Sequence, residues 1–440
     1  MPDDRLSAAD LTYLAVEAPD TPMHVGALVV LDGGPLRDPA GRIRLNELRA
    51  AFLERLDAVP HLRRRPHRSG PLTGRPVWVE DPDFRIERHV SLVNVAPPGD
   101  DAALLGLADR LLEPVLDRSH PLWRIWLIDG LAGGRVALLI AVHHAIADGP
   151  AALDLFLPLL TGSPPTARPA ATPAATPAAT PAARRLSARL RGRLAGPLPG
   201  WLRGRSGWHR MRAAIRAPRT SLNAPIGRHR SSAVVRLPLG TTRAVAHAAG
   251  GTVNDVLLDL AAGGIRALLR QRGEPVDGVE LHVAVPVSPR ERQSGSTGNQ
   301  AGIVIVRLPL APADPVVRLG LVHRATASAK HGQAGGSPPL VWLARSGLMR
   351  VFTRHQRLTN LVVSNVVGPA DPLVVLGAPV LELIPLGALA GNLALTFLAL
   401  SYAGTLVVSV RADRERFADL PVLVAAMNEE WQTMAAPPVM

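Results

Sequence analysis

The most informative stretch of the sequence is LLIAVHHAIADG, at residues 138–149. Its first five residues are apolar and predict a buried strand, and an apolar helical pattern follows over 151–160. A hydrophobic strand that ends in polar residues ahead of a helix is a common place for a functional site. The candidate catalytic residues are therefore His144, His143 and Asp148, with Gly149 as a supporting residue.

The two histidines suit general-base catalysis, because neutral imidazole near pH 7 can accept a proton from an alcohol. Asp148 could hold the loop by pairing with an arginine or with backbone amides, and Gly149 permits a tight turn and leaves space beside the imidazole. The alternative is structural: two core or surface histidines ahead of an Asp-Gly helix start. Adjacent residues on a strand point to opposite faces, so only one of His143 and His144 can face a substrate, and a shared metal site is not expected.

Other catalytic sets find no support in the composition. The chain has no cysteine, which excludes disulfides, thiolate metal sites and a cysteine nucleophile. Lys330 is the only lysine, and no phosphate-binding loop surrounds it. The G-x-S-x-G and H-E-x-x-H patterns are also absent from the sequence. We expect no metal and no bound cofactor.

The regions on either side predict a mixture of strands and helices over 440 residues, enough for two or three domains. Strands are expected at 23–31, 122–128, 135–142, 234–237, 283–287 and 303–308, and helices at 45–56, 253–270 and 417–434. Residues 383–410 carry no charge, which is long enough for a membrane span. Because prolines and glycines interrupt this stretch, a buried hairpin of 392–400 and 405–411 is the better prediction.

The middle of the chain has a different composition. Residues 162–183 contain the near-repeat ATPAATPAATPAA and predict an extended linker. Residues 184–219 carry eleven arginines and no acid, together with leucines and tryptophans. Such a segment suits an anionic membrane or lipid-droplet surface, although a solvated, partly disordered arm remains open and nucleic-acid binding is the poorest of the three. The predicted division is 1–161, 162–225 and 226–440.

Several ordered motifs resemble the bacterial wax ester synthase/acyl-CoA:diacylglycerol acyltransferases, within the larger coenzyme A-dependent acyltransferase and condensation-domain superfamily. They are Ser7–Asp10 with Glu17 and Pro22–Gly26, the P-L-W element Pro121–Trp123, His143–Gly149, the N-D element Asn254-Asp255, Pro286–Ser288 with Arg290 and Gly298-Asn299, and Ser364–Pro369. The last reads SNVVGP, with Val367 where the family has proline, which puts the rigidity of that loop in question.

The resemblance implies an α/β fold of two chloramphenicol-acetyltransferase-like subdomains, each a mixed sheet with helices, forming a pseudo-dimer around a substrate tunnel. It assigns the base to His144, with His143 and Asp148 in support, which the residues alone could not rank. Acyl-CoA is then the co-substrate, and diacylglycerol or a fatty alcohol is the acceptor. Asn254 or the pair Ser364 and Asn365 are candidate oxyanion donors.

The resemblance leaves some roles and functions open. Asn254 and Asp255 would serve equally as helix caps, and Trp123 is expected in the core or the tunnel wall. An acyltransferase for a polyketide or glycolipid hydroxyl is the second function, and a non-catalytic lipid-surface protein the third. The polar, acidic N-terminus has no signal-peptide pattern, so we expect a cytoplasmic enzyme associated peripherally with membrane or lipid droplets.

Overall fold

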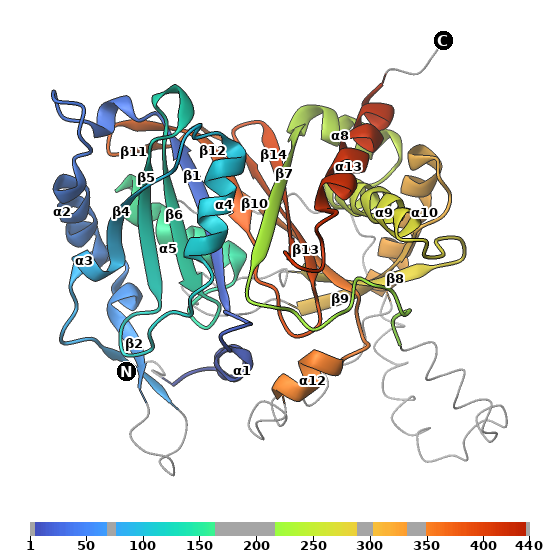
Figure 1. Ribbon diagram of the computed structural model, residues 1–440, viewed down its shortest axis with the longest axis horizontal. Helices are drawn as coiled ribbons and strands as arrows, with labels where there is room; N and C mark the ends of the chain where they lie inside the picture. The colour runs from blue at the N-terminus through green and yellow to red at the C-terminus, as the bar shows by residue number, and fades with distance from the viewer. Residues whose placement is uncertain (1–4, 68–75, 163–215, 288–301, 332–348, 437–440) are drawn as a thin grey trace, which may run out of the picture.

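Two six-stranded mixed sheets lie side by side in the computed structural model, which describes residues 5–67, 76–162, 216–287, 302–331 and 349–436 (Figure 1). The strand order is β11-β12-β1-β6-β5-β4 in the first sheet and β7-β14-β13-β10-β8-β9 in the second. Helices pack on both sheets, so the expected α/β class with two sheet-and-helix subdomains is confirmed.

The first half of the chain supplies most of the first sheet. Its strands are β1 (His24–Leu31), β4 (Val90–Asn94), β5 (Trp123–Asp129) and β6 (Val136–His143), with a separate hairpin of β2 (Arg64–His67) and β3 (Val77–Glu80). Its helices are α1 (Ala8–Val16), α2 (Leu45–Arg55), α3 (Ile86–His89), α4 (Asp101–Leu111) and α5 (Gly149–Thr161). The predicted strands of this half and its two predicted helices, at 45–56 and 151–160, are confirmed.

The second half supplies the other sheet and its helices. The strands are β7 (Arg230–Pro238), β8 (Glu280–Val287), β9 (Gly302–Pro309), β10 (Leu361–Val367), β13 (Leu395–Tyr402) and β14 (Thr405–Asp413). The helices are α8 (Leu239–Ala248), α9 (Val253–Gln271), α10 (Pro315–His331), α12 (Met349–His355) and α13 (Leu420–Ala435). Strands β13 and β14 form the predicted hairpin. Among the described residues, no helix has the length and apolar character that crossing a bilayer requires.

Three strands of this half are not among those predicted from the sequence. The SNVVGP motif is expected to be a loop, but its residues 364–367 belong to β10. Strand β12 (Ala378–Leu386), with the short β11 (Val374–Val375), leaves the second half and pairs antiparallel with β1. Residues 374–386 of the expected 226–440 unit therefore complete the first sheet.

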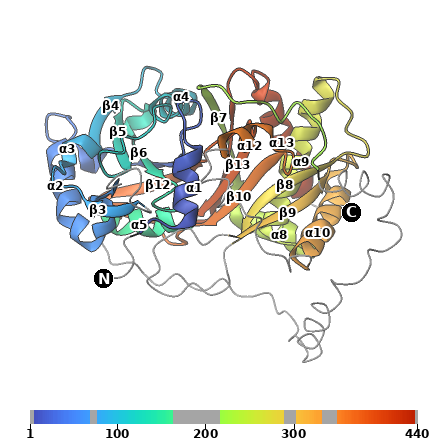
Figure 2. The ribbon, with the colours of Figure 1, turned by 90° about the horizontal axis from the view of Figure 1, so that it is seen from below.

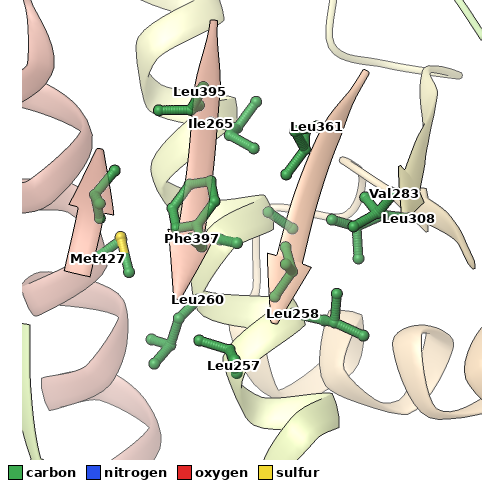
Figure 3. Close-up of a cluster of buried hydrophobic side chains, with 14 of the residues drawn as sticks. Leu257, Leu258, Leu260, Ile265, Val283, Leu308, Leu361, Leu395, Phe397 and Met427 are labelled. Atoms are coloured by element: carbon green, nitrogen blue, oxygen red, sulfur yellow. The ribbon is translucent and has the colours of Figure 1, made fainter. Parts of the chain in front are cut away.

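A large apolar core fixes the second sheet against its helices. Figure 3 shows its centre, where Leu257 and Ile265 of α9 and Met427 of α13 surround Phe397 of β13. Phe397 and Ile265 are fully buried. These helices cover one face of the second sheet. The opposite face carries Ser364 and Leu398 and is directed at the first half of the chain.

Some predictions fall on residues outside the described ranges. They are the linker 162–183 beyond its first residue, the arginine-rich segment up to residue 215, and the motif residues Ser288, Arg290, Gly298 and Asn299. These stay predictions.

Candidate active site

The two histidines of the motif point to opposite faces of the first sheet, as strand alternation requires. His143 is the last residue of β6 and pairs with His24 of β1. The amide of His144 donates a hydrogen bond of 2.8 Å to the Met23 carbonyl oxygen, which continues the strand pairing by one residue. The His144 side chain lines a cavity, whereas His143 is fully buried on the other side.

His143 is held by a contact on each ring nitrogen. Its Nδ1 accepts a hydrogen bond of 2.9 Å from the Ala145 amide, so the ring proton lies on Nε2. That nitrogen is 3.1 Å from Oε1 of Glu17, whose side chain is only 4% exposed. Although burial opposes the charge, the side chains of His143 and Arg118 hold the pKa of the Glu17 carboxyl at about 2. His143 therefore supports the loop and is not placed to act as a base.

His144 has the environment of a neutral base. Burial, followed by the neighbouring His143 and His24, lowers the pKa of its imidazole to about 4. The ring stacks on Tyr13 of α1, with 4.7 Å between centroids and 12° between planes. At neutral pH the imidazole is uncharged and can accept a proton.

Asp148 and Gly149 shape the turn that follows. Asp148 is the N-cap of α5, and its carboxylate accepts a hydrogen bond of 3.0 Å from the Ala151 amide. This is the backbone-amide role expected for it. A Cβ on Gly149 would lie 3.3 Å from Cγ2 of Val366, so glycine lets α5 approach β10 of the second sheet closely. The space that Gly149 leaves is thus beside Val366.

The cavity beside His144 has a volume of about 190 Å³ and lies between the two sheets and α5. Among the described residues that line it, only His144, Ser364 and Thr396 carry polar side-chain atoms. Along β1 the lining extends from Val25 to Val29, about 13 Å at about 3.3 Å per residue. A long apolar pocket that ends at a neutral histidine suits a substrate with an alkyl chain.

Ser364 and Asn365 are separated by the alternation of β10. Ser364 lines the cavity with Val362 and Val366. Asn365, the next residue, is not among the described lining residues, and its buried Oδ1 has no hydrogen-bond partner. Of the two, Ser364 is the one on the His144 side of the sheet.

Comparison with known proteins identifies the family of this chain. The family model described as the wax ester synthase/diacylglycerol acyltransferase catalytic domain matches residues 6–257, and the model of the corresponding C-terminal domain matches 297–435. The chain belongs to the wax ester synthase/diacylglycerol acyltransferase family. It is accordingly an acyltransferase.

Relatives and solved structures agree with this family. A Mycobacterium tuberculosis protein named as a diacylglycerol O-acyltransferase is 31% identical over 448 residues, covering 97% of this chain and 94% of that protein. The wax ester synthase/diacylglycerol acyltransferase from Marinobacter aquaeolei VT8 superimposes with a TM-score of 0.71 at 23% identity, covering 98% of both chains. The first condensation domain of the CDA synthetase has a TM-score of 0.59 at 17% identity, covering 100% of this chain and 97% of that one, and shows the shared fold.

The N-D element of this family member lies away from the cavity. Asp255 forms a capping box with Thr252 at the start of α9 and accepts a hydrogen bond of 2.6 Å from the Thr326 hydroxyl of α10. No residue of α9, Asn254 included, is among the described residues lining the cavity. Asp255 thus has the capping role left open for it, and the structure does not bring Asn254 to His144.

Trp123 of the P-L-W element belongs to the core. It is fully buried, and its indole N–H donates a hydrogen bond of 2.7 Å to the Leu62 carbonyl oxygen. Its ring meets that of Phe156 edge-on at 6.1 Å, and Phe156 lines the cavity. Trp123 therefore supports the wall from behind.

Two residues next to the histidines were not predicted as site residues. Glu17 belongs to the N-terminal signature, which gives it no role, and Tyr13 belongs to none of the motifs. Tyr13 and Glu17 are four residues apart, so they lie on the same face of α1, with Glu17 at its C-terminal end. This spacing does not predict which distant strand the face will contact. Figure 2 shows α1 at the border between the two halves of the molecule.

Proposed function

We propose that this enzyme transfers a fatty acyl group from acyl-CoA to the hydroxyl of diacylglycerol or a long-chain alcohol, with His144 as general base. The products are triacylglycerol or wax ester. The observation that carries the proposal is a neutral, half-buried imidazole at the wall of an apolar cavity between the sheets. His143 and Asp148 of the same motif hold the loop that carries this imidazole.

The reaction proceeds by direct transfer. His144 accepts the proton of the acceptor hydroxyl while its oxygen forms a bond to the thioester carbonyl carbon. The carbonyl oxygen becomes an oxyanion, for which the Ser364 hydroxyl, which lines the same cavity from β10, is a side-chain donor. When the carbon–sulfur bond breaks, the CoA thiolate takes the proton back from His144. This sequence requires no covalent acyl-enzyme and no cofactor beyond acyl-CoA as co-substrate.

The test is acceptor-dependent release of CoA thiol from palmitoyl-CoA, with hexadecanol or dioleoylglycerol as acceptor. We expect His144→Ala to reduce this release by on the order of 10²–10⁴-fold, the usual contribution of a general base. His247→Ala, the same change at an exposed histidine, should leave it unchanged. Equal release by wild type and His144→Ala would exclude His144 as the base. Release that neither acceptor stimulates would favour a polyketide or glycolipid hydroxyl, or a non-catalytic protein.

We also propose that residues 184–215 hold the enzyme on an anionic lipid surface, because the arginines there are accompanied by no acid. Deletion of these residues keeps Ala217, which is buried and bonded to Arg357. The deleted form should lose cosedimentation with phosphatidylserine vesicles but retain turnover of a detergent-dispersed alcohol. Unchanged cosedimentation would contradict the assignment.

A further inference from the structure

Helix α1 is anchored independently of the histidines. Ser7 and Asp10 form a capping box in which the Ser7 amide donates a hydrogen bond of 2.8 Å to Asp10 Oδ2 and the Asp10 amide one of 3.1 Å to Ser7 Oγ. The Leu6 amide donates to the Pro76 carbonyl oxygen at 3.0 Å. At the other end, Val16 packs with Met23 and Met349. The helix is therefore a fixed support for whatever its inner face contacts.

That inner face contacts both histidines of the motif, each in a different way. Glu17 approaches the Nε2 of His143, and Tyr13, one helical turn earlier, stacks on the ring of His144. The ring planes of Tyr13 and His144 differ by only 12° at a centroid separation of 4.7 Å. Such a stack covers one face of the imidazole and leaves its nitrogens, which bond in the ring plane, directed away from the tyrosine.

We propose that Tyr13 is a positioning residue for the reaction, whose ring sets the plane of the His144 imidazole and shields one face of it from water. The inference rests on the proposed function of His144 as base. Proton transfer needs the base within hydrogen-bond reach and correctly aligned. An aliphatic side chain at position 13 is smaller than the tyrosine ring, so it would neither impose a parallel plane nor cover the face of the imidazole.

The contact acts through the ring, not through the phenol oxygen. Tyr13 is half-buried, and burial, then the charges of Asp148 and Asp10, raises the pKa of its hydroxyl. The hydroxyl therefore stays protonated through the working pH range and supplies no charge. Tyr13→Phe keeps the stack, whereas Tyr13→Leu removes it.

The test compares these two variants in the CoA-release assay, with Leu14→Ala as the control for the packing of α1. Leu14 is the next residue on the helix and packs against the apolar core of the first sheet. We expect Tyr13→Phe to be within about twofold of wild type. Tyr13→Leu should lose kcat by on the order of 10–100-fold with little change in KM, because a misaligned group costs up to about that factor. Leu14→Ala should keep kcat.

A second readout follows His144 itself. The acid limb of the kcat/KM profile should move upward in pH in Tyr13→Leu, because an imidazole exposed to water is more easily protonated. The NMR titration of the His144 ring, assigned by its absence in His144→Ala, should move the same way even in the absence of turnover. If wild type releases no CoA, the proposed function fails, and the NMR titration then decides only whether the Tyr13 ring shields the His144 imidazole.

Three outcomes would overturn the assignment. Tyr13→Leu with wild-type kcat and an unmoved titration would show that the stack is dispensable. If Tyr13→Phe loses as much kcat as Tyr13→Leu, the tyrosine hydroxyl, and not the stacked ring, would be responsible for the effect. An equal loss in Leu14→Ala would show that general packing of α1, not the ring on His144, is responsible.

Discussion

At the level of single residues, three histidines of this protein are uncharged at neutral pH. They are His24, His89 and His144. Burial first, and nearby charges second, lower the pKa of each imidazole to about 4. His24 donates its Nε2 proton to the Leu112 carbonyl oxygen at 2.8 Å, and His89 lies between the rings of Phe84 and Trp123. Protonation of His24 or His89 places a charge in the protein interior, and protonation of His144 places one at the wall of the apolar cavity.

The pH dependence of stability follows from these residues. An unfolded histidine titrates near pH 6.5, so between that value and about 4 the unfolded chain binds the extra protons and the fold loses stability as the pH falls. Each such histidine contributes a slope of about 1.4 kcal/mol per pH unit within that window. His89→Phe should reduce the slope of the free energy of unfolding against pH by the contribution of one histidine. Urea unfolding at several pH values measures this slope. A slope equal to that of wild type would contradict this account.

Below this window Glu17 adds a loss of its own. Its carboxyl has a pKa of about 2 in the fold against 4.5 for the free group, so its stabilising contribution is present above pH 4.5 and disappears as the pH falls towards 2. Both effects act in the same direction, and acid weakens the loop that presents His144.

At the scale of elements, the crossover of β12 into the first sheet joins the halves beside the cavity. Tyr402 of β13 stabilises this crossover with one hydroxyl. It accepts a hydrogen bond of 2.7 Å from the Leu373 amide and donates one of 3.1 Å to the Val380 carbonyl oxygen. Because Leu373 and Val380 also line the cavity, the same bridge fixes part of its wall.

Tyr402→Phe should therefore lower the free energy of unfolding by about 1–3 kcal/mol, since it leaves a buried amide without its acceptor. The urea midpoint should fall at an unchanged m value. Thr433→Ala removes the hydroxyl of an exposed helix position that bonds to the Glu429 carbonyl oxygen, and should cost under about 0.5 kcal/mol. Equal effects of the two changes would show that the Tyr402 bridge contributes no more than a surface contact.

At the scale of the whole molecule, buried charged groups join the two halves. Arg411 of β14 lies 3.2 Å from Asp109 of α4, with both side chains at most 5% exposed. Asp109 also accepts a hydrogen bond of 2.7 Å from the Ser232 hydroxyl, and Arg411 donates one of 2.9 Å to the Gly387 carbonyl oxygen. The contact lies between the two halves, and Gly387, to which Arg411 is bonded, lines the cavity.

Removing one member of such a pair leaves the other charge buried without compensation. Asp109→Ala should therefore cost about 3–5 kcal/mol in the free energy of unfolding. Glu47→Ala breaks an exposed pair with Arg44 on α2 and should cost less than about 1 kcal/mol. Thermal unfolding of both variants is the check, and similar melting temperatures would show that the Asp109 pair does not hold the halves together.

The local secondary structure around the histidine motif can be predicted from the sequence alone. Strand β6, the histidine pair and the turn at Asp148 follow from periodicity and capping chemistry, which neighbouring residues fix among themselves. The alternation of a strand even dictates that only one histidine faces the cavity. The ordered motifs were enough to indicate the family.

Only the tertiary structure decided which distant residues meet. The contacts of Tyr13 and Glu17 with the histidines, and the pairing of β12 with β1, join segments far apart in the chain. Ser364 could be separated from Asn365 only once β10 was known to be a strand. Such pairings depend on the burial of apolar faces across the whole molecule, and that global balance leaves no signature in the local pattern of residues.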